Sequence, residues 1–208
     1  MQLTILAASG GTGQELTRQA LERGHTVTAI ARRPARIAIP DSAGLRRVAA
    51  DVRDPGSIKA ALTGSRVVLS GLGVADGDPP GVLTAGARAV TEAHPDMIIW
   101  LGALGTGPSA QAGGLLVRTL FLAMAAKLED KVTADTTVLR AGGTVFHAGP
   151  LTGDPIGPTR RTVGLDAYPR RLFPARVSRA TVAAAMLDEA EDPRYAGTIA
   201  IPLQRGRP

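Results

Sequence analysis

The residues best suited to chemistry begin with a glycine-rich stretch near the start of this 208-residue chain. Ser9-Gly10-Gly11-Thr12-Gly13 directly follows an apolar run, Leu3–Ala8, and precedes an amphipathic segment. A strand, a glycine-rich turn and a helix in this order present backbone N–H groups that can bind the pyrophosphate of a dinucleotide. A glycine-rich turn alone is weak evidence, but its position between a strand and a helix is the context that this function requires. We therefore predict a pyrophosphate-binding turn, with a plain tight turn as the alternative.

The first glycine of the usual dinucleotide-binding pattern is replaced by alanine. Gly10 and Gly13 keep the spacing, whereas Ala8 takes the first position in the GxGxxG register and Ala7 takes it in the GxxGxxG register. Alanine tolerates such a turn only where its φ is negative, because a Cβ atom disfavours the left-handed region. We therefore expect a negative φ at these alanines.

A basic group follows the second apolar run, Thr26–Ala31. Arg32 and Arg33 come at its end, and Arg36 lies one helical turn further on. An acidic residue here would bind the ribose 2′-hydroxyl and repel a 2′-phosphate, whereas a guanidinium can hold a phosphate through two parallel hydrogen bonds. The sequence therefore predicts NADPH/NADP as the cofactor. A solvated basic loop is the alternative.

Two aspartates follow the third apolar run, and each has its own interpretation. Asp51 can accept a hydrogen bond from the adenine amino group while Val52 packs on the ring, whereas Asp54 is suited to cap a helix that begins at Pro55. The predicted cofactor-binding residues are Ser9, Gly10, Gly11, Thr12, Gly13, Arg32, Arg33, Arg36, Asp51, Val52, Ser70 and Gly71.

Apolar and amphipathic segments alternate along the chain, which predicts a single α/β domain over residues 1–208 with a doubly wound parallel sheet. The expected strands are Leu3–Ala8, Thr26–Ala31, Leu45–Ala50, Arg66–Ser70, Met97–Leu101, Thr144–Ala148 and Thr198–Ile201. The expected helices are Gln14–Arg23, Pro55–Leu62, Val82–Ala93, Lys127–Ala141 and Arg179–Ala190. Residues 149–178 are rich in proline and glycine, so we expect loops and short strands on the substrate side of the sheet.

These motifs resemble a known family. The strings Ile5–Gly13, Ala29–Arg32, Asp51-Val52 and Ala60–Gly64 are similar to atypical short-chain dehydrogenases/reductases. Within that group, the chain resembles the NAD(P)H-binding, NmrA-like set that includes the flavin reductase also called biliverdin reductase B. Further matches are Gly86-Ala87-Arg88, Val138–Gly142 and Pro150–Asp154. The resemblance covers nearly the whole chain and implies a Rossmann-type fold.

The catalytic part of the family pattern is altered. The tyrosine of the Tyr-x-x-x-Lys pair should lie four residues before Lys131, where the chain has Lys127, and its tyrosines are Tyr168 and Tyr195. The serine that many relatives carry after the fifth strand is missing from Leu101-Gly102-Ala103, and the usual Arg-Pro after the sixth strand reads His147-Ala148. The standard proton donor of a carbonyl reductase is therefore absent.

Three other residues are candidates for catalytic roles. Histidine is the side-chain type best suited to acid–base chemistry near neutral pH, and His147 should lie near the end of the sixth strand, although a structural hydrogen bond would also explain it. Lys131 is expected to contact the nicotinamide ribose, as the family lysine does, or else to be a surface lysine. Ser109 could donate a hydrogen bond to a substrate. Asp76 and Asp78, in a glycine-rich loop, are expected to be solvated.

Composition limits the partners. The chain has no cysteine, which excludes disulfides and thiolate metal sites, and no metal site is predicted. Its net charge is +6, but the arginines are scattered and aromatic residues make up only 3%, which argues against nucleic-acid binding. The most apolar stretch, Leu115–Ala126, contains Arg118 and is too short to span a membrane. We expect a cytoplasmic protein without a signal peptide, either a monomer or a homodimer.

Three functions remain open at this stage. The first is an NADPH-dependent reductase that transfers hydride to a flat, apolar, conjugated acceptor such as a flavin or a quinone, which needs no tyrosine. The second is a non-catalytic NADP(H)-binding sensor or regulator, as some NmrA-like proteins are. The third is a tailoring enzyme, for example a ketoreductase or isomerase, that uses His147 or Lys131 as an acid or base.

Overall fold

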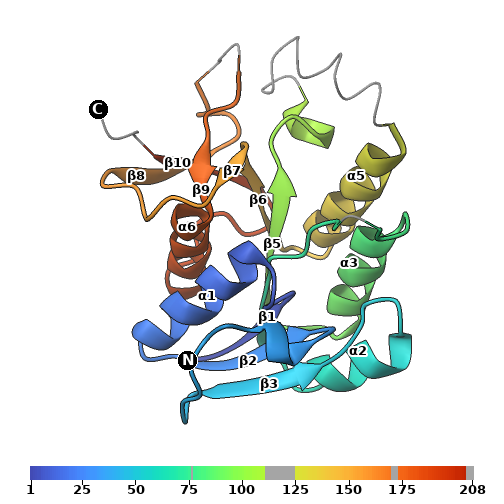
Figure 1. Cartoon of the computed structure of the whole chain (residues 1–208). Coiled ribbons are helices and arrows are strands. Elements are labelled where there is room, and N and C mark those ends of the chain that lie inside the picture. The colour runs from blue at the N-terminus through green and yellow to red at the C-terminus, as the bar shows by residue number, and fades with distance from the viewer. Residues whose placement is uncertain (76, 111–124, 170–172, 205–208) are drawn as a thin grey trace.

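One large sheet forms the centre of the molecule (Figure 1). The structure is a computed structural model that describes residues 1–75, 77–110, 125–169 and 173–204. Within these ranges the sheet has eight strands in the order β3-β2-β1-β4-β5-β6-β10-β8. The parallel strands are β1 (Gln2–Leu6), β2 (Thr26–Ala31), β3 (Leu45–Ala49), β4 (Val67–Ser70), β5 (Met97–Ala103), β6 (Thr144–Ala148) and β10 (Ile199–Gln204). This order confirms the predicted doubly wound, Rossmann-type α/β fold.

Helices cover both faces of the sheet, as alternating strands and helices require. On one face, α1 (Gly11–Glu22) lies beside α6 (Arg179–Glu191), while α2 (Pro55–Leu62), α3 (Val82–Glu92) and α5 (Ala125–Arg140) cover the other face (Figure 1). Two short 3₁₀ turns, η1 (Pro34–Arg36) and η2 (Gly107–Ser109), follow β2 and β5. The core is correspondingly split in two layers, with Trp100 buried in one and Phe146 in the other.

The helices α2 and α6 each begin directly after a residue whose side chain caps the first turn. The carboxylate of Asp54 accepts hydrogen bonds from the backbone N–H groups of Gly56 and Ser57, which confirms the capping interpretation of that residue. Ser178 caps α6 in the same way through the N–H of Thr181. By contrast, α1 begins after Gly10 and has no side-chain cap.

The glycine-rich turn differs from the sequence expectation. Ala7 has a φ of +60°, so the expected negative φ at this alanine is wrong. The turn begins at this residue, with the N–H of Gly10 donating to the carbonyl of Ala7 at 2.9 Å. As a result, β1 ends at Leu6 instead of Ala8, and α1 begins at Gly11 instead of Gln14. The tight turn imposes a strained conformation on Ala7.

Residues 149–178 contain loops and short strands, as predicted. β7 (Leu151–Thr152) pairs with β9 (Val177–Ser178) in a small parallel sheet. β8 (Arg160–Gly164) pairs antiparallel with β10 at the edge of the large sheet, and the charged residues at its start hid this strand from pattern analysis. Most of the apolar stretch Leu115–Ala126, which the sequence suggested was too short to span a membrane, lies outside the described residues.

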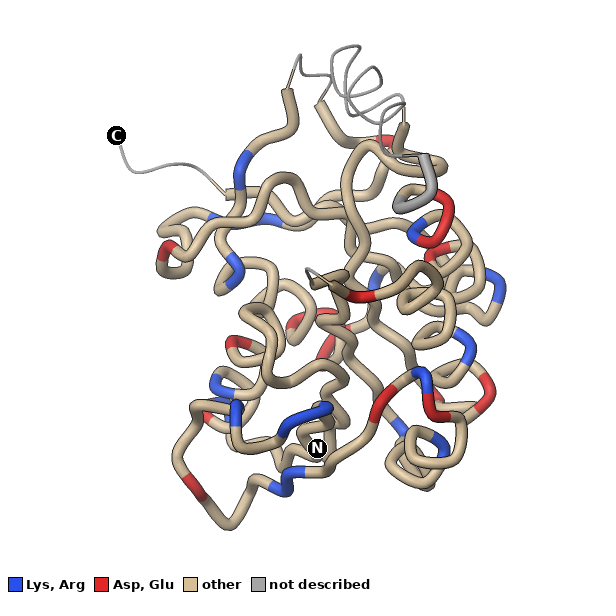
Figure 2. The backbone as a smooth tube through the Cα atoms, turned by 45° about the vertical axis from the view of Figure 1, so that its right-hand side comes forward, with Lys and Arg blue, Asp and Glu red and all other residues tan. Residues whose placement is uncertain are grey.

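Two further expectations concern the distribution of basic residues and membrane-spanning helices. Lys and Arg positions are distributed over many elements instead of gathering on one helix or strand (Figure 2). In the described part of the chain, no helix has the length and apolar character needed to cross a bilayer.

Candidate functional site

The main cavity opens where the carboxyl ends of β1, β2, β4, β5 and β6 meet. Its volume is about 570 Å³, and it brings together residues from both halves of the fold. Among the predicted cofactor-binding and catalytic residues, the ones that line it are Ser9, Gly10, Gly11, Thr12, Arg32, Arg36, Asp51, Val52, Gly71 and Lys131. A crevice beyond the carboxyl ends of parallel strands is where doubly wound sheets bind ligands.

The glycine-rich turn packs too closely for side chains. A Cβ atom on Gly13 would lie 2.2 Å from the carbonyl oxygen of Ala7, and one on Gly71 would lie 3.0 Å from the backbone nitrogen of Gly13. Gly13 therefore lets α1 pack on β1 and does not itself line the cavity. Since no side chain caps α1, its first N–H groups are left to bind an anion, and the helix dipole favours negative charge there.

Arg179 is a site residue that sequence analysis missed. It is the first residue of α6, and its side chain lies across Gly11: a Cβ atom on Gly11 would be 2.7 Å from Arg179 Cδ and 2.9 Å from Nε. Arg179 also lines the main cavity. Nothing in the sequence links an arginine so late in the chain to the first turn; the packing of α6 beside α1 brings them together.

A second cavity of about 530 Å³ adjoins the end of β2. Four arginines and two aspartates contribute to its lining, which consists of Ser9, Arg32, Arg33, Arg36, Asp51, Arg53, Ala75, Gly77 and Asp78. The structure thus brings the three predicted arginines to one pocket and adds Arg53. Such a pocket suits a phosphate group, because guanidinium groups form strong charge-assisted hydrogen bonds with it. We call this the arginine pocket.

Asp51 and Val52 occupy different surroundings. Arg53 donates to both carboxylate oxygens of Asp51, at 3.1 and 2.7 Å, and this interaction is the main reason that the pKa of Asp51 falls to about 2. Val52 is nearly buried but lines the main cavity, where its side chain could pack on a ring. The carboxylate of Asp51 is therefore ionised and already engaged by Arg53.

Asp78 is not solvated, so that expectation is wrong. Its side chain is only 7% exposed, and its Oδ1 accepts a hydrogen bond of 2.7 Å from Arg32 Nη1. Its other oxygen accepts from the backbone N–H of Ala75 at 2.9 Å. These interactions lower the pKa of Asp78, with the Ala75 hydrogen bond as the largest cause. Asp76 lies outside the described residues.

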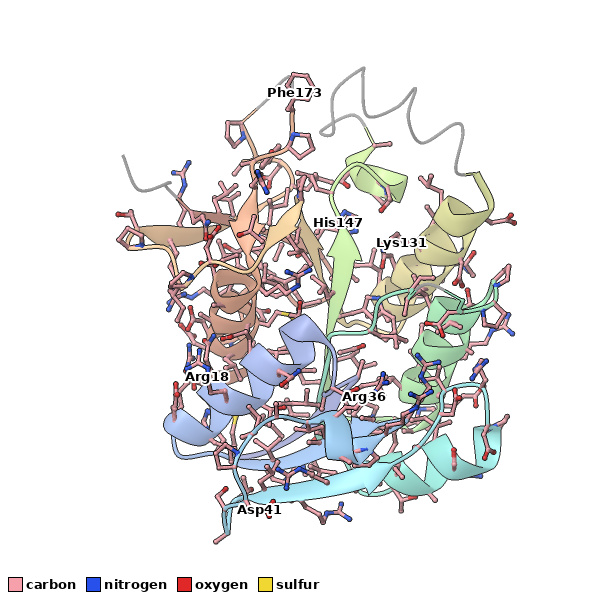
Figure 3. The ribbon with its side chains drawn as sticks, in the orientation of Figure 1. Arg18, Arg36, Asp41, Lys131, His147 and Phe173 are labelled. Atoms are coloured by element: carbon pink, nitrogen blue, oxygen red, sulfur yellow. The ribbon has the colours of Figure 1, made fainter. Side chains whose placement is uncertain are left out.

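The opposite end of the main cavity is mostly apolar. Its lining there consists of Leu101, Gly102, Ala103, Lys131, Ala148, Gly149 and Leu151. Lys131 is half-buried on α5, and burial lowers its pKa while the negative charges of Asp135 and Asp130 oppose the shift. Figure 3 places Lys131 near the carboxyl end of β5, close to the position of His147 in the view.

His147 and Ser109 belong to a buried hydrogen-bond network. Ser109 Oγ lies 2.6 Å from His147 Nδ1, and His147 Nε2 lies 3.1 Å from an oxygen of Asp135. The side chain of His147 is completely buried, Ser109 is also buried, and neither residue lines the main cavity. Ser109 Oγ also accepts from the N–H of Gly105 at 2.9 Å and lies 3.0 Å from the carbonyl of Thr106. These contacts tie the segment after β5 to β6 and α5.

Asp135 was missed, although it lies one helical turn after Lys131 on α5 and that spacing could have indicated it. The network also leaves no room for a side chain at Gly102. A Cβ atom on Gly102 would lie 2.9 Å from Asp135 Oδ2 and 2.8 Å from His147 Cδ2.

The remaining candidates lie away from the cavity. Ser70 is fully buried, and its hydroxyl accepts a hydrogen bond from the N–H of Leu72, so only Gly71 of the predicted pair reaches the lining. Tyr168 is buried in the core, and the hydroxyl of Tyr195 donates to the carbonyl of Thr162. Neither tyrosine lines the cavity.

Comparison with known proteins identifies the family. A model of an NAD(P)H-binding family matches residues 7–193. The chain belongs to this NAD(P)H-binding family. The predicted cofactor class, NAD(P)H, is thereby confirmed.

Solved structures share the fold. A wide-type short-chain dehydrogenase/reductase from Veillonella parvula in complex with NADP has a TM-score of 0.79 at 18% identity, with 99% of this chain and 95% of that chain covered. A proposed NADH-flavin reductase from Streptococcus pneumoniae gives 0.76 at 18% identity, covering 99% and 100%. An anaerobilin reductase from Escherichia coli O157:H7 gives 0.77 at 17% identity, covering 100% and 99%. Comparison with curated protein sequences found no match.

Proposed function

We propose that this protein is an NADPH-dependent reductase that transfers hydride to a flat, conjugated acceptor such as a flavin or a quinone. The observation that supports this most is the part of the main cavity beside β5 and β6, where Lys131 is accompanied by Leu101, Gly102, Ala103, Ala148, Gly149 and Leu151. Reduction of a conjugated acceptor can take its proton from solvent, so the protein needs to supply mainly proximity and orientation. The names of two similar structures, a flavin reductase and an anaerobilin reductase, point to the same acceptor class.

In this proposal the cofactor lies across the carboxyl end of the sheet. Its pyrophosphate binds the first N–H groups of α1 and the guanidinium of Arg179, and its adenine packs on Val52. Its 2′-phosphate binds in the arginine pocket, which is the reason to propose NADPH over NADH. When bound, the nicotinamide supplies the hydride.

Lys131 is the catalytic candidate that can reach the bound cofactor. Its ammonium group would hydrogen-bond to the nicotinamide ribose and hold the ring toward the acceptor. Burial lowers the pKa of Lys131. As pH rises, its ammonium group therefore loses its proton, and this contact weakens, at a lower pH than for an exposed lysine.

His147 and Ser109 are proposed as positioning residues. Their buried network links the Gly102–Ala103 backbone, which lines the cavity, to Asp135 on the helix that carries Lys131. Replacing Ser109 by alanine would leave a buried backbone N–H of Gly105 without its acceptor, at a cost of about 1–3 kcal/mol in stability. S109A should also shift the pH at which kcat/KM declines as Lys131 loses its proton. A loss of stability alone would not shift that pH.

The test is steady-state oxidation of NADPH by purified protein with FMN, riboflavin and a panel of quinones. Turnover with at least one of these acceptors, faster with NADPH than with NADH, is expected. Binding of NADPH without turnover on any acceptor would instead favour the second candidate, an NADP(H)-binding sensor, which the lack of a tyrosine in the cavity lining also suits. A tailoring enzyme with His147 as acid or base is less favoured, because that side chain is completely buried.

A further inference from the structure

The arginine pocket already contains an anion of the protein's own. Asp78, in the segment between β4 and α3, places its carboxylate against Arg32, at the end of β2 where a cofactor 2′-phosphate would need its countercharge. The carboxylate is nearly buried, whereas the side chain of Arg32 is 48% exposed. Its second oxygen is held by the N–H of Ala75, so the protein's own backbone sets its position.

Among the described lining residues of the pocket, arginines outnumber aspartates. Four arginines face two aspartates, leaving a net charge of +2 among the described lining residues. Asp51 is engaged by Arg53 and Asp78 by Arg32, whereas Arg33 and Arg36 form no ion pair within the described ranges. A 2′-phosphate carries about −1.5 to −2 charges at pH 7, which would neutralise this excess.

We propose that Asp78 competes with the cofactor's 2′-phosphate for Arg32 and thereby limits the preference of this protein for NADP(H) over NAD(H). This inference rests on the proposed 2′-phosphate site. When NADP(H) binds, Arg32 must exchange the carboxylate for the phosphate or hold both anions side by side, and either arrangement costs binding free energy. NAD(H) has no such phosphate, so the Arg32–Asp78 pair stays intact when it binds.

The contact between Arg32 and Asp78 suits an exchangeable partner. Arg32 uses a single N–H group on Asp78, whereas Arg53 holds both oxygens of Asp51. The backbone turn from Ala75 to Asp78 is closed by its own hydrogen bond of 3.1 Å, independently of Arg32. The pKa of Asp78 lies below its ordinary value, so the carboxylate stays ionised at neutral pH and the competition persists there.

The experiment compares the wild-type protein with Asp78→Asn, which keeps the shape of the side chain and removes its charge. Dissociation constants for NADP⁺, NAD⁺ and the fragments 2′,5′-ADP and 5′-AMP are measured by titration calorimetry at low salt. We expect D78N to bind NADP⁺ and 2′,5′-ADP about tenfold more tightly, as removal of one nearby like charge predicts, with NAD⁺ and 5′-AMP changed less than twofold.

Asp96→Asn is the matched control. Asp96 forms an exposed ion pair of 2.6 Å with Arg66, and neither residue lines the arginine pocket, so D96N should leave all four constants unchanged. Asp78→Ala is a second variant, because it also removes the charge but leaves no amide to hydrogen-bond Arg32. Thermal melting shows whether each variant is folded.

The outcomes separate this inference from the proposed function. A wild-type preference for NADP⁺ that D78N and D78A leave unchanged, or that they reduce, would overturn the competition while the 2′-phosphate site stands. Equal binding of NADP⁺ and NAD⁺ by wild type and both variants would overturn the 2′-phosphate site itself. A stronger preference for NADP⁺ in both variants supports the competition.

Discussion

The two ends of the main cavity differ in what they offer a ligand. The end beside β2 is crowded with charge, since Arg32, Arg36 and Asp51 line it and Arg33 lies in the adjoining arginine pocket. The end beside β5 and β6 presents mainly backbone and apolar side chains, together with Lys131. Under the proposed function, this difference would let charge select the cofactor and leave the reaction to proximity and shape.

Removing charge from the arginine pocket should have the largest effect. The double variant Arg32→Gln with Arg36→Gln is expected to weaken NADPH binding about 100-fold, since hydrogen bonds to charged groups contribute about 1.5–3 kcal/mol each. NADH binding should change little, because NADH lacks the 2′-phosphate. Fluorescence titration of both cofactors measures this, and Arg66→Gln, an exposed arginine outside both cavities, is the control. Equal weakening of both cofactors would remove the distinction between the two ends.

Arg179 lines the main cavity against Gly11 and should not discriminate between cofactors. Replacement by glutamine is expected to weaken NADPH and NADH alike, by about tenfold, because the pyrophosphate that it would bind is common to both. The same titration measures it. A loss confined to NADPH would instead assign Arg179 to the 2′-phosphate.

Lys131 should affect turnover more than the recognition of phosphate. Lys131→Met is expected to reduce kcat/KM about fivefold with either cofactor, a modest loss of the size expected for one hydrogen bond. In the wild type, kcat/KM should fall as pH rises through the pKa of Lys131, which burial has lowered, because the ammonium loses its proton there. K131M should lack this decline. A decline that persists in K131M would assign it to another group.

The smallest effect concerns the turn that both ends share. Ala7→Gly should stabilise the fold by about 0.5–1 kcal/mol, because glycine adopts the observed φ of +60° without strain. Ala60→Gly, at an exposed position inside α2, should destabilise by about 0.5–1 kcal/mol and serves as the opposite control. Urea denaturation measures both. A destabilised A7G would show that the alanine side chain stabilises the turn enough to offset the strain.

Sequence alone predicted the parts of the molecule that depend on local chemistry. Asp54 before Pro55 identified the start of α2, and the strand–turn–helix order identified the glycine-rich turn between β1 and α1. It could not predict contacts made by tertiary packing. Arg179 reaches Gly11 only because α6 lies beside α1, and Asp78 is engaged only because its loop meets the end of β2. The same limit explains why His147 and Ser109 stood as separate candidates before the structure showed that they are in contact.

The most direct test of this account is the ratio of kcat/KM for NADPH to that for NADH, with FMN or a quinone as acceptor. We predict measurable turnover and a ratio well above one, because charge selects the cofactor and the apolar end needs no proton donor of its own. Turnover with a ratio of one or below, in the wild type and in D78N alike, would contradict the role of the arginine pocket. No turnover with any acceptor, despite tight binding of NADPH, would contradict the proposed reaction.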